Sequence, residues 1–333
     1  MATKVKSIDG LMRHLRDTHN IDIKGSIQKQ KLRNIGYYHG YKGYRYFKTP
    51  NNQFLYTDFN QVLAVNEFDM ELKALFYPKI MFIETAIKNY TLEVILDCIG
   101  TDSFNDVYSK LLTHYNSFPI ASKDYKFELK QRLELQNKIY SSLSRNYNTK
   151  LVIQHYYHQD RNVPIWAIFE VITLGEFGKF IHCLNQNTRK LISTSIGLNQ
   201  GYDTDSKLTE SIIYLLRDLR NAVAHNDIIF DTRFKTGQVK KTLVHALSND
   251  CKVQDINFNT ITDYVILISF ILKQLGVSKT EISKMISDFD NLKEEFRQKI
   301  PYNIYSKIIH TDTNNKLLAQ LSQLKNNHTS LIF

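Results

Sequence analysis

The sequence predicts an all-α protein, and three observations lead to that fold class. Its 333 residues include only 12 Gly and 5 Pro, fewer than an all-β chain with many tight turns needs. Hydrophobic residues make up 43% of the sequence, which is enough for a buried core and argues against wholesale disorder. Apolar residues also recur at three- and four-residue steps through long segments, as they do on one face of a helix.

The longest of these segments covers residues 58–99. Its apolar residues keep helical spacing over much of that length: Leu72, Leu75, Phe76, Ile80, Ile83, Ile87 and Tyr90. Pro78 predicts a kink or a break inside the segment, because proline lacks the backbone N–H that a helix needs. Gly100 is a natural stop signal. We therefore expect a long helix that is disturbed near Pro78 and ends at Gly100.

Other parts of the chain show weaker versions of the same pattern. Pro164 suits the first turn of a helix, and Ser278 with Glu281 forms a capping box for a helix that reaches about residue 298. The tail from His310 onward is polar and Asn-rich up to a last apolar stretch at residues 331–333. Further helices are expected at residues 10–17, 122–140, 186–195, 206–226 and 257–275.

These elements divide the chain into an N-terminal element (1–57), a helical core (58–275) and a C-terminal helical extension with its tail (276–333). The N-terminal element interleaves aromatic and basic residues within residues 31–47: Tyr37, Tyr38, Tyr41, Tyr44, Tyr46 and Phe47 with Arg33, Lys42 and Arg45. Such a mixture can stack bases and hold phosphates. The alternative, which we favour, is that the tyrosines pack this element onto the main body.

The charge balance fits a nucleic-acid partner. Lys and Arg number 43 against 33 Asp and Glu, a net charge of +10, and the pI is about 9.2. Phosphates are held largely by Lys and Arg, so a positive surface suits RNA. A Lys-rich, solvated exterior would give the same balance, and charge therefore supports an RNA partner without requiring one.

Several classes of protein are disfavoured by missing motifs. Cys98, Cys183 and Cys251 lie far apart and form no CxxC pair, which argues against a zinc ribbon or a disulfide framework and fits a reducing cytoplasm. The first twenty residues contain no apolar stretch typical of a secretory signal. The longest apolar run, 264–272, is too short to cross a bilayer. We therefore expect a cytoplasmic protein with no membrane partner.

Sites for metals and cofactors are not predicted. Gly175 and Gly178 occur as LGEFG, without the Lys-Ser/Thr of a phosphate-binding loop. His155 and His158 lie near Asp160, but no third and fourth ligand follows at the spacing of a metal site. The chain also lacks the GxSxG sequence of common serine hydrolases. We expect no metal and no cofactor.

The most informative segment is residues 208–227. It is apolar on nearly every side, which predicts a helix in the interior or at an interface. Polar side chains in such a helix cost free energy unless they are partnered. Tyr214, Asp218, Asn221 and His225 fall in one stripe about 60° wide, while Arg220 lies about 140° from His225.

That separation bears on any joint role of Arg220 and His225. One straight helix cannot point both at the same phosphate. The arrangement requires an irregular helix end, the reach of the long arginine side chain, or a second copy of the motif. We expect a symmetric homodimer in which the two motifs face each other across the two-fold axis.

Residues 220–225, RNAVAH, resemble the Rx4–6H signature of HEPN ribonucleases, in its common form with a polar residue after the arginine. Other blocks resemble the Abi-like family of AbiD/AbiF-type abortive infection proteins in the same order along the chain. Residues 35–47 resemble its "GYY…GY…F" element, 82–90 its "iE…lr" helix, and 164–180 its "P.W…E…TfG" block. Together with the flanking segments, the resemblance spans about residues 8–275.

Two departures from the family pattern lie outside the RNAVAH motif. Lys88 stands where an arginine is usual, and Leu174 stands where a phenylalanine is usual.

The resemblance implies a HEPN-like helical bundle that carries the N-terminal element and the C-terminal helices as additions. It also implies a metal-independent endoribonuclease that uses the neighbouring 2′-hydroxyl, in abortive phage defence or as the toxin of a toxin–antitoxin system. Arg220 would clamp the phosphate, and His225 would transfer protons near neutral pH. Asn221 would orient the imidazole or a phosphate oxygen. RNA would be the substrate, and an RNA is also a candidate antitoxin.

Other interpretations of the same residues stay open. Arg220 can be a buried arginine paired with Glu170 or Glu84, and His225 a satisfied residue near a helix end. The corresponding functions are a non-catalytic RNA- or protein-binding module of the same fold and a purely structural helical scaffold.

Overall fold

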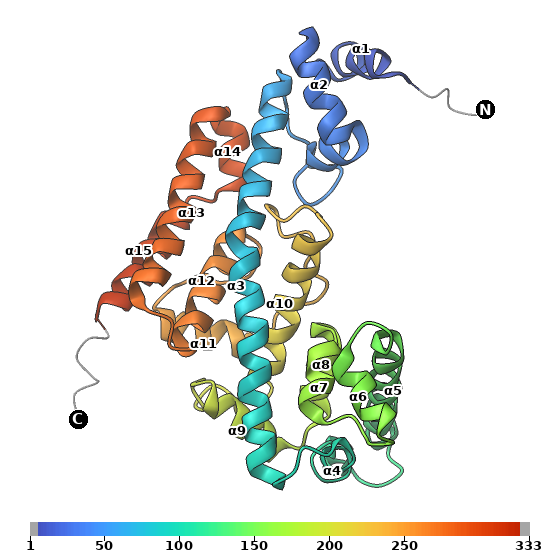
Figure 1. Ribbon diagram of the computed structural model, residues 1–333. Helices are drawn as coiled ribbons and strands as arrows, with labels where there is room; N and C mark the ends of the chain where they lie inside the picture. Colours follow the sequence, from blue (N-terminus) through green and yellow to red (C-terminus); the bar gives the residue numbers. More distant parts are fainter. Residues whose placement is uncertain (1–5, 327–333) are drawn as a thin grey trace.

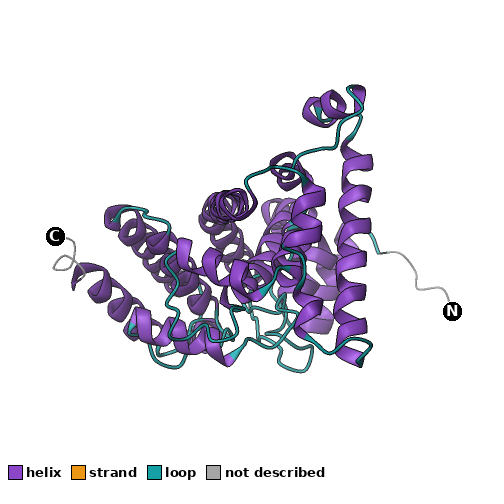
Figure 2. Ribbon diagram, turned by 90° about the horizontal axis from the view of Figure 1, so that it is seen from below, coloured by secondary structure: helices purple, strands orange, loops and turns teal. Residues whose placement is uncertain are grey.

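A computed structural model describes residues 6–326. Within that range the chain forms fifteen α-helices, one short π-helical segment and one 3-10 turn. Figure 2 shows helices and loops only for the described residues, and the two β-bridges are isolated. The predicted all-α class is confirmed. The apolar stretch at 331–333 lies outside the described residues.

The longest element is α3 (Phe59–Ile99), which runs through the middle of the molecule (Figure 1). It has 41 residues, so its axis is about 60 Å long. Asp58 caps its start and Gly100, with φ of 67°, ends it. The helix continues through Pro78, so the predicted break is wrong. Pro78 is exposed, so its ring faces solvent. The helices that pack along the rest of α3 keep the backbone helical at this position.

The second half of the chain packs along α3. Contacts with α3 are made by α10 (Leu208–Ala224), α12 (Ile261–Gln274) and α13 (Lys279–Lys299). Nearly every residue of α12 is buried, as expected of a helix that is apolar all round. The shorter helices α11 (Lys241–Cys251) and α14 (Tyr302–Ile308) lie beside them.

The polar tail contains one more helix, α15 (Thr313–Asn326), which the sequence pattern did not predict. It packs on α12 and α13 and buries Leu317, Gln320 and Leu324. These three positions share one face at helical spacing, but one of them is a glutamine, and the apolar Leu318 and Leu321 lie off that face and blur the period. The C-terminal helices thus extend the same core that α3 and α12 form.

Residues 104–195 form a group of shorter helices near the C-terminal end of α3 (Figure 1). They are α4 (Phe104–Lys110), η2 (His114–Ser117), α5 (Lys123–Asn146), α6 (Leu151–His158), α7 (Ile165–Val171), α8 (Leu174–Cys183) and α9 (Gln186–Ser195). Pro164 is the N-cap residue of α7. Thr173 and Glu176 form a reciprocal capping box that starts α8 directly after α7.

The N-terminal element lies at the opposite end of α3 (Figure 1). It consists of α1 (Ile8–His19), α2 (Gly25–Ile35) and the π-helical segment Gly36–Lys42. Tyr37, Tyr41 and Tyr44 are buried, which confirms the packing interpretation for these three tyrosines. Tyr38 points outward instead and is 75% exposed, with the Lys42 ammonium 4.8 Å from its ring centroid.

None of the helices between residues 6 and 326 is long and apolar enough to cross a membrane.

Candidate active site

Helix α10 carries the RNAVAH motif and is buried along most of its length, as the sequence predicts. It packs against α8 and α3. Gly178 of the LGEFG sequence allows the close approach of α8, because a Cβ there would lie 2.9 Å from the Tyr214 ring. Asp218, inside the predicted polar stripe, is buried and accepts hydrogen bonds from the Thr236 backbone N–H at 2.9 Å and hydroxyl at 2.7 Å.

The motif lies where α10 emerges from the core. Asn226 takes a left-handed conformation with φ of 57°, which ends the helix and turns the chain. Its side-chain oxygen accepts a 2.7 Å hydrogen bond from the Lys73 ammonium of α3. Its amide nitrogen lies 3.3 Å from His39 Nε2 of the N-terminal element. The end of the helix is therefore anchored to two other elements at the residue after His225.

His225 itself is exposed at the C-cap position of α10. Its backbone N–H donates to the Asn221 carbonyl at 2.9 Å. Among residues 6–326, its imidazole makes no hydrogen bond or ion pair. The exposed ring leaves both imidazole nitrogens open to solvent or to a ligand.

Arg220 has a different environment. Its Nε lies 3.8 Å from Glu84 Oε2 on α3, and one terminal nitrogen donates weakly to the Asn221 side-chain oxygen at 3.4 Å. Glu84 in turn accepts a 3.0 Å ion pair from Lys88 one turn along α3. Of the two carboxylates expected as partners, Glu84 is therefore the one that pairs and Glu170 is not. The Arg220 side chain is still 32% exposed.

The structure does not bring the three predicted site residues to one point within a single chain. Helix α10 is regular up to Ala224, so Arg220 and His225 stay on different faces. The Asn221 side chain is exposed and contacts Arg220, and the predicted contact between Asn221 and the His225 imidazole is absent from residues 6–326. One chain thus presents an anchored guanidinium and an open imidazole, separated around the helix.

A protein-family model described as Abi-like protein matches residues 30–231. The chain belongs to the Abi-like family. The matched range covers more than half of the sequence and includes all of α3 and α10 with the RNAVAH motif. No curated protein and no solved structure matches the chain. Membership of this family suggests a part in abortive phage defence.

Two hollows of about 380 Å³ each flank the motif of this Abi-like protein. One lies on the Arg220 side and is lined by Glu84, Lys88 and Trp166 among others. The second lies beyond the end of α10 and is lined by aromatic, basic and acidic side chains: Tyr38, His39, Tyr46, Asp227, Ile228, Arg233 and Phe234. The motif therefore separates two concave surfaces that both carry an exposed or partly exposed aromatic ring.

A buried ionic network supports the end of α10, and sequence reasoning missed it. Asp69 of α3 pairs with Lys73 at 2.8 Å and accepts from the backbone N–H groups of Ile229 and Phe230, both at 2.8 Å. The Tyr44 hydroxyl donates to the same carboxylate at 2.9 Å. Asp69 and Lys73 lie on an otherwise apolar helix face. A pair of opposite charges at i and i+4 on such a face is the sequence feature that could have predicted this buried network.

The sequence predicts no metal site, and His155, His158 and Asp160 form no group of possible metal ligands among the described residues. In the described part of the chain, the group of side chains whose ligand atoms lie within 4.8 Å of one another is His114, Glu128 and His182. These residues come from three elements, and their spacing in the sequence matches no known metal motif.

Proposed function

We propose that this Abi-like protein is a metal-independent endoribonuclease of the HEPN type, acting in abortive phage defence or as the toxin of a toxin–antitoxin system. The observation that carries the proposal is the exposed imidazole of His225 at the open end of α10, five residues after the anchored Arg220. A net charge of +10 suits an RNA substrate.

The residues suit cleavage through the neighbouring 2′-hydroxyl. A base removes the 2′-hydroxyl proton, the 2′-oxygen attacks phosphorus, and the 5′-oxygen leaves with a proton from an acid. The products are a 2′,3′-cyclic phosphate and a 5′-hydroxyl. His225 supplies proton transfer. The exposed part of the Arg220 guanidinium holds the non-bridging oxygens as negative charge develops on them, and Asn221 adds an amide beside it.

A second copy of the chain completes the site in this proposal. Cleavage needs a base and an acid, and one chain presents a single His225. An exposed apolar stripe runs beside the motif on α3, where Met70 and Tyr77 are 44% and 45% exposed. Met70, Tyr77 and Met81 lie within about 40° of one another around the helix. Lys73 and Glu84 lie directly beside that stripe. Glu84 contacts the last turns of α10, and Lys73 contacts Asn226 just beyond the end of the helix.

The need for a second His225 and the exposed apolar stripe on α3 together lead us to propose a homodimer. A partner that buried the α3 stripe would bring its own Arg220 and His225 to the same place, because a two-fold interface uses the same patch on both copies. Exposed apolar patches next to an incomplete polar site are typical of such interfaces.

The two hollows beside the motif suit the nucleotides on either side of the cleaved phosphate. Trp166 lines one and Tyr38 the other, and both rings are exposed. Single-stranded RNA is held by stacking bases on aromatic side chains and by basic groups along the backbone. Lys88 and Lys42 lie close to these two rings.

The second candidate is a non-catalytic module that binds RNA or a protein. The observation in its favour is that Arg220 is already paired with Glu84, as an arginine with a structural role would be. Such a module would bind RNA with steep salt dependence but would leave it intact.

Growth on induced expression separates these functions. A ribonuclease toxin arrests growth as wild type, and the arrest disappears in Arg220→Ala and His225→Ala. Both variants should accumulate in folded form, because the Arg220 side chain is 32% exposed and His225 is exposed at the helix end. Arrest that persists in both folded variants would contradict the proposed site. Equal RNA affinity of all three proteins without any cleavage would support the binding module.

A further inference from the structure

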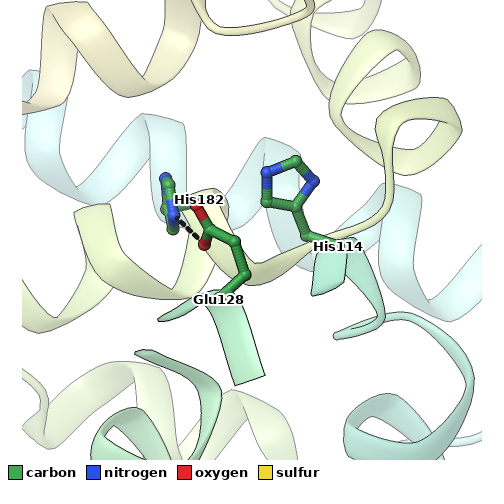
Figure 3. A group of neighbouring side chains, drawn as sticks. All are labelled: His114, Glu128 and His182. Carbon is green, nitrogen blue, oxygen red and sulfur yellow. Dashed lines mark hydrogen bonds and ion pairs between the residues drawn. The ribbon is translucent and has the colours of Figure 1, made fainter. Parts of the chain in front are cut away.

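A second polar cluster lies far from the RNAVAH motif, among the short helices (Figure 3). It brings together His114 of η2, Glu128 of α5 and His182 of α8. His182 Nε2 lies 2.7 Å from Glu128 Oε2, and the two imidazole centroids are 5.4 Å apart. The ligand atoms of all three residues lie within 4.8 Å of one another.

One nitrogen of this cluster has no partner. His114 is only 6% exposed, and its Nε2 makes no hydrogen bond within the described chain. Figure 3 shows a ring nitrogen of His114 directed toward His182 and Glu128. The other nitrogen, Nδ1, faces Arg189 at 3.4 Å. A buried ring nitrogen without a partner is costly, which points to a missing ligand between the three side chains.

The surroundings of His182 are those of a metal-binding histidine. Its second nitrogen, Nδ1, lies 3.2 Å from Glu210 Oε1 on α10. Histidines that ligate metals nearly always donate their other ring N–H to a carboxylate or carbonyl, which fixes the tautomer.

Charge is the feature that opposes a cation here. The Arg189 guanidinium lies beside His114, and its contact with Nδ1 must be released if that nitrogen carries the ring proton. Glu128 and Glu210 supply two negative charges at the same place, and Glu210 Oε2 is buried without a partner. Arg189 and Lys207 supply nearby positive charge, and a divalent ion bound beside the two carboxylates would take the place of the His182 ring proton.

We propose that His114 Nε2, His182 Nε2 and the Glu128 carboxylate bind a divalent first-row transition metal of the zinc type, with Glu210 as the carboxylate behind His182. Zn²⁺ accepts two histidines and one glutamate at about 2.0–2.2 Å. Tetrahedral ligands at that distance are about 3.3 Å apart. The 2.7 Å separation of His182 and Glu128 has to widen by less than 1 Å, and His114, whose ligand atom lies within 4.8 Å of the other two, has to close in on them.

The ion would have a structural role. It would tie η2, α5 and α8 together and, through Glu210, hold the first turn of α10. Glu210 precedes His225 by about 22 Å along the α10 axis. The ion therefore lies away from the RNAVAH motif and takes no part in the proposed RNA cleavage.

Zinc titration of the purified full-length chain, after removal of metal by a chelator, tests the site. We expect one Zn²⁺ per chain and a higher melting temperature when zinc is added. His114→Ala, His182→Ala and Glu128→Gln should each weaken zinc binding at least 100-fold. Glu210→Gln should weaken it by 10- to 100-fold, as loss of an outer carboxylate does. His155→Ala is the matched control, and it should bind as wild type does.

No zinc binding by the wild type, or equal binding by the wild type and the folded ligand variants, would overturn the proposal. Since these variants can lose stability, Co²⁺ absorption of the wild type gives a second measurement. Strong visible bands of four-coordinate Co²⁺ are expected, and a spectrum of hexa-aqua Co²⁺ alone would contradict the site. RNA cleavage that continues after chelation separates this inference from the proposed function, which does not depend on it.

Discussion

Arg220 and His225 are five residues apart in one helix, yet the fold gives them different surroundings. Arg220 Nε lies 3.8 Å from Glu84 Oε2 as an ion pair without a hydrogen bond, while His225 is open to solvent at the end of the helix. A guanidinium that binds phosphate gains from being fixed in advance. A proton-transfer group must reach the substrate and exchange protons with water. The two environments thus match the roles proposed for the two residues.

Glu84→Gln tests the anchoring role. The amide keeps the shape of the carboxylate but loses the charge that holds Arg220. We expect kcat/KM for RNA cleavage to fall about tenfold, which is about 1.4 kcal/mol, with the pH profile unchanged. Glu170→Gln is the control, because Glu170 lines the same hollow and does not pair with Arg220. Equal effects of the two substitutions would mean that Glu84 contributes only negative charge to the hollow and does not position Arg220.

Several site residues were predictable one at a time but not as a set. The Rx4–6H spacing selects Arg220, Asn221 and His225 as candidates, and Glu84, one of two expected partners of Arg220, is the one that lies beside it. His39, Lys73 and Asn226 meet at the end of α10 from three distant segments. Nothing in local spacing reveals such a meeting, because it depends on how α3 and the N-terminal element dock. The same holds for His114, Glu128 and His182.

At the scale of single elements, helical period predicted the buried helices best. The predicted range 206–226 is close to α10, and 257–275 is close to α12, because an unbroken apolar face fixes both type and extent. Prediction failed where tertiary packing decides. Helix α3 passes through Pro78 since burial along the rest of its length outweighs the local cost. Helix α15 was missed because its few apolar residues gain their effect only against α12 and α13.

Pro78→Ala measures that local cost. The substitution restores a backbone N–H to a continuous, exposed part of α3, so the free energy of unfolding should rise by about 1–3 kcal/mol. Urea denaturation of the two proteins gives the value. A loss of stability would show that the proline ring makes a favourable contact that its exposure does not suggest.

The end of α10 can be tested at Asn226. Asn226→Gly keeps the left-handed backbone but removes the side chain that accepts from Lys73. Asn226→Ala removes the same side chain and adds a strain of about 1 kcal/mol for a left-handed alanine. Both should lower the free energy of unfolding, with alanine the lower of the two. Equal stability in urea would mean that the helix end relaxes out of the left-handed conformation.

At the scale of the whole molecule, we propose that one chain presents half of a composite site. The long helix α3 connects the N-terminal element, the motif helix and the C-terminal helices (Figure 1). Its exposed apolar stripe beside the motif is the surface on which we propose that a second chain docks.

Tyr77→Glu places a charge in that stripe and should shift the protein from dimer to monomer. RNA cleavage should be lost with it, while the helical content stays the same. Tyr302→Glu is the control, since Tyr302 is also an exposed tyrosine but lies on α14. Sedimentation velocity gives the oligomeric state. A wild-type protein that is monomeric yet cleaves RNA would contradict the composite site and leave the imidazole of His39 as a second proton-transfer group to examine.

The proposed metal-independent ribonuclease site depends most on His225. The most direct measurement is the cleavage of a labelled single-stranded RNA in EDTA by the wild type and by His225→Ala, with circular dichroism of both proteins under the same conditions. We predict cleavage by the wild type to a 2′,3′-cyclic phosphate end and none by the folded variant. Equal cleavage by the two proteins would contradict the proposed site.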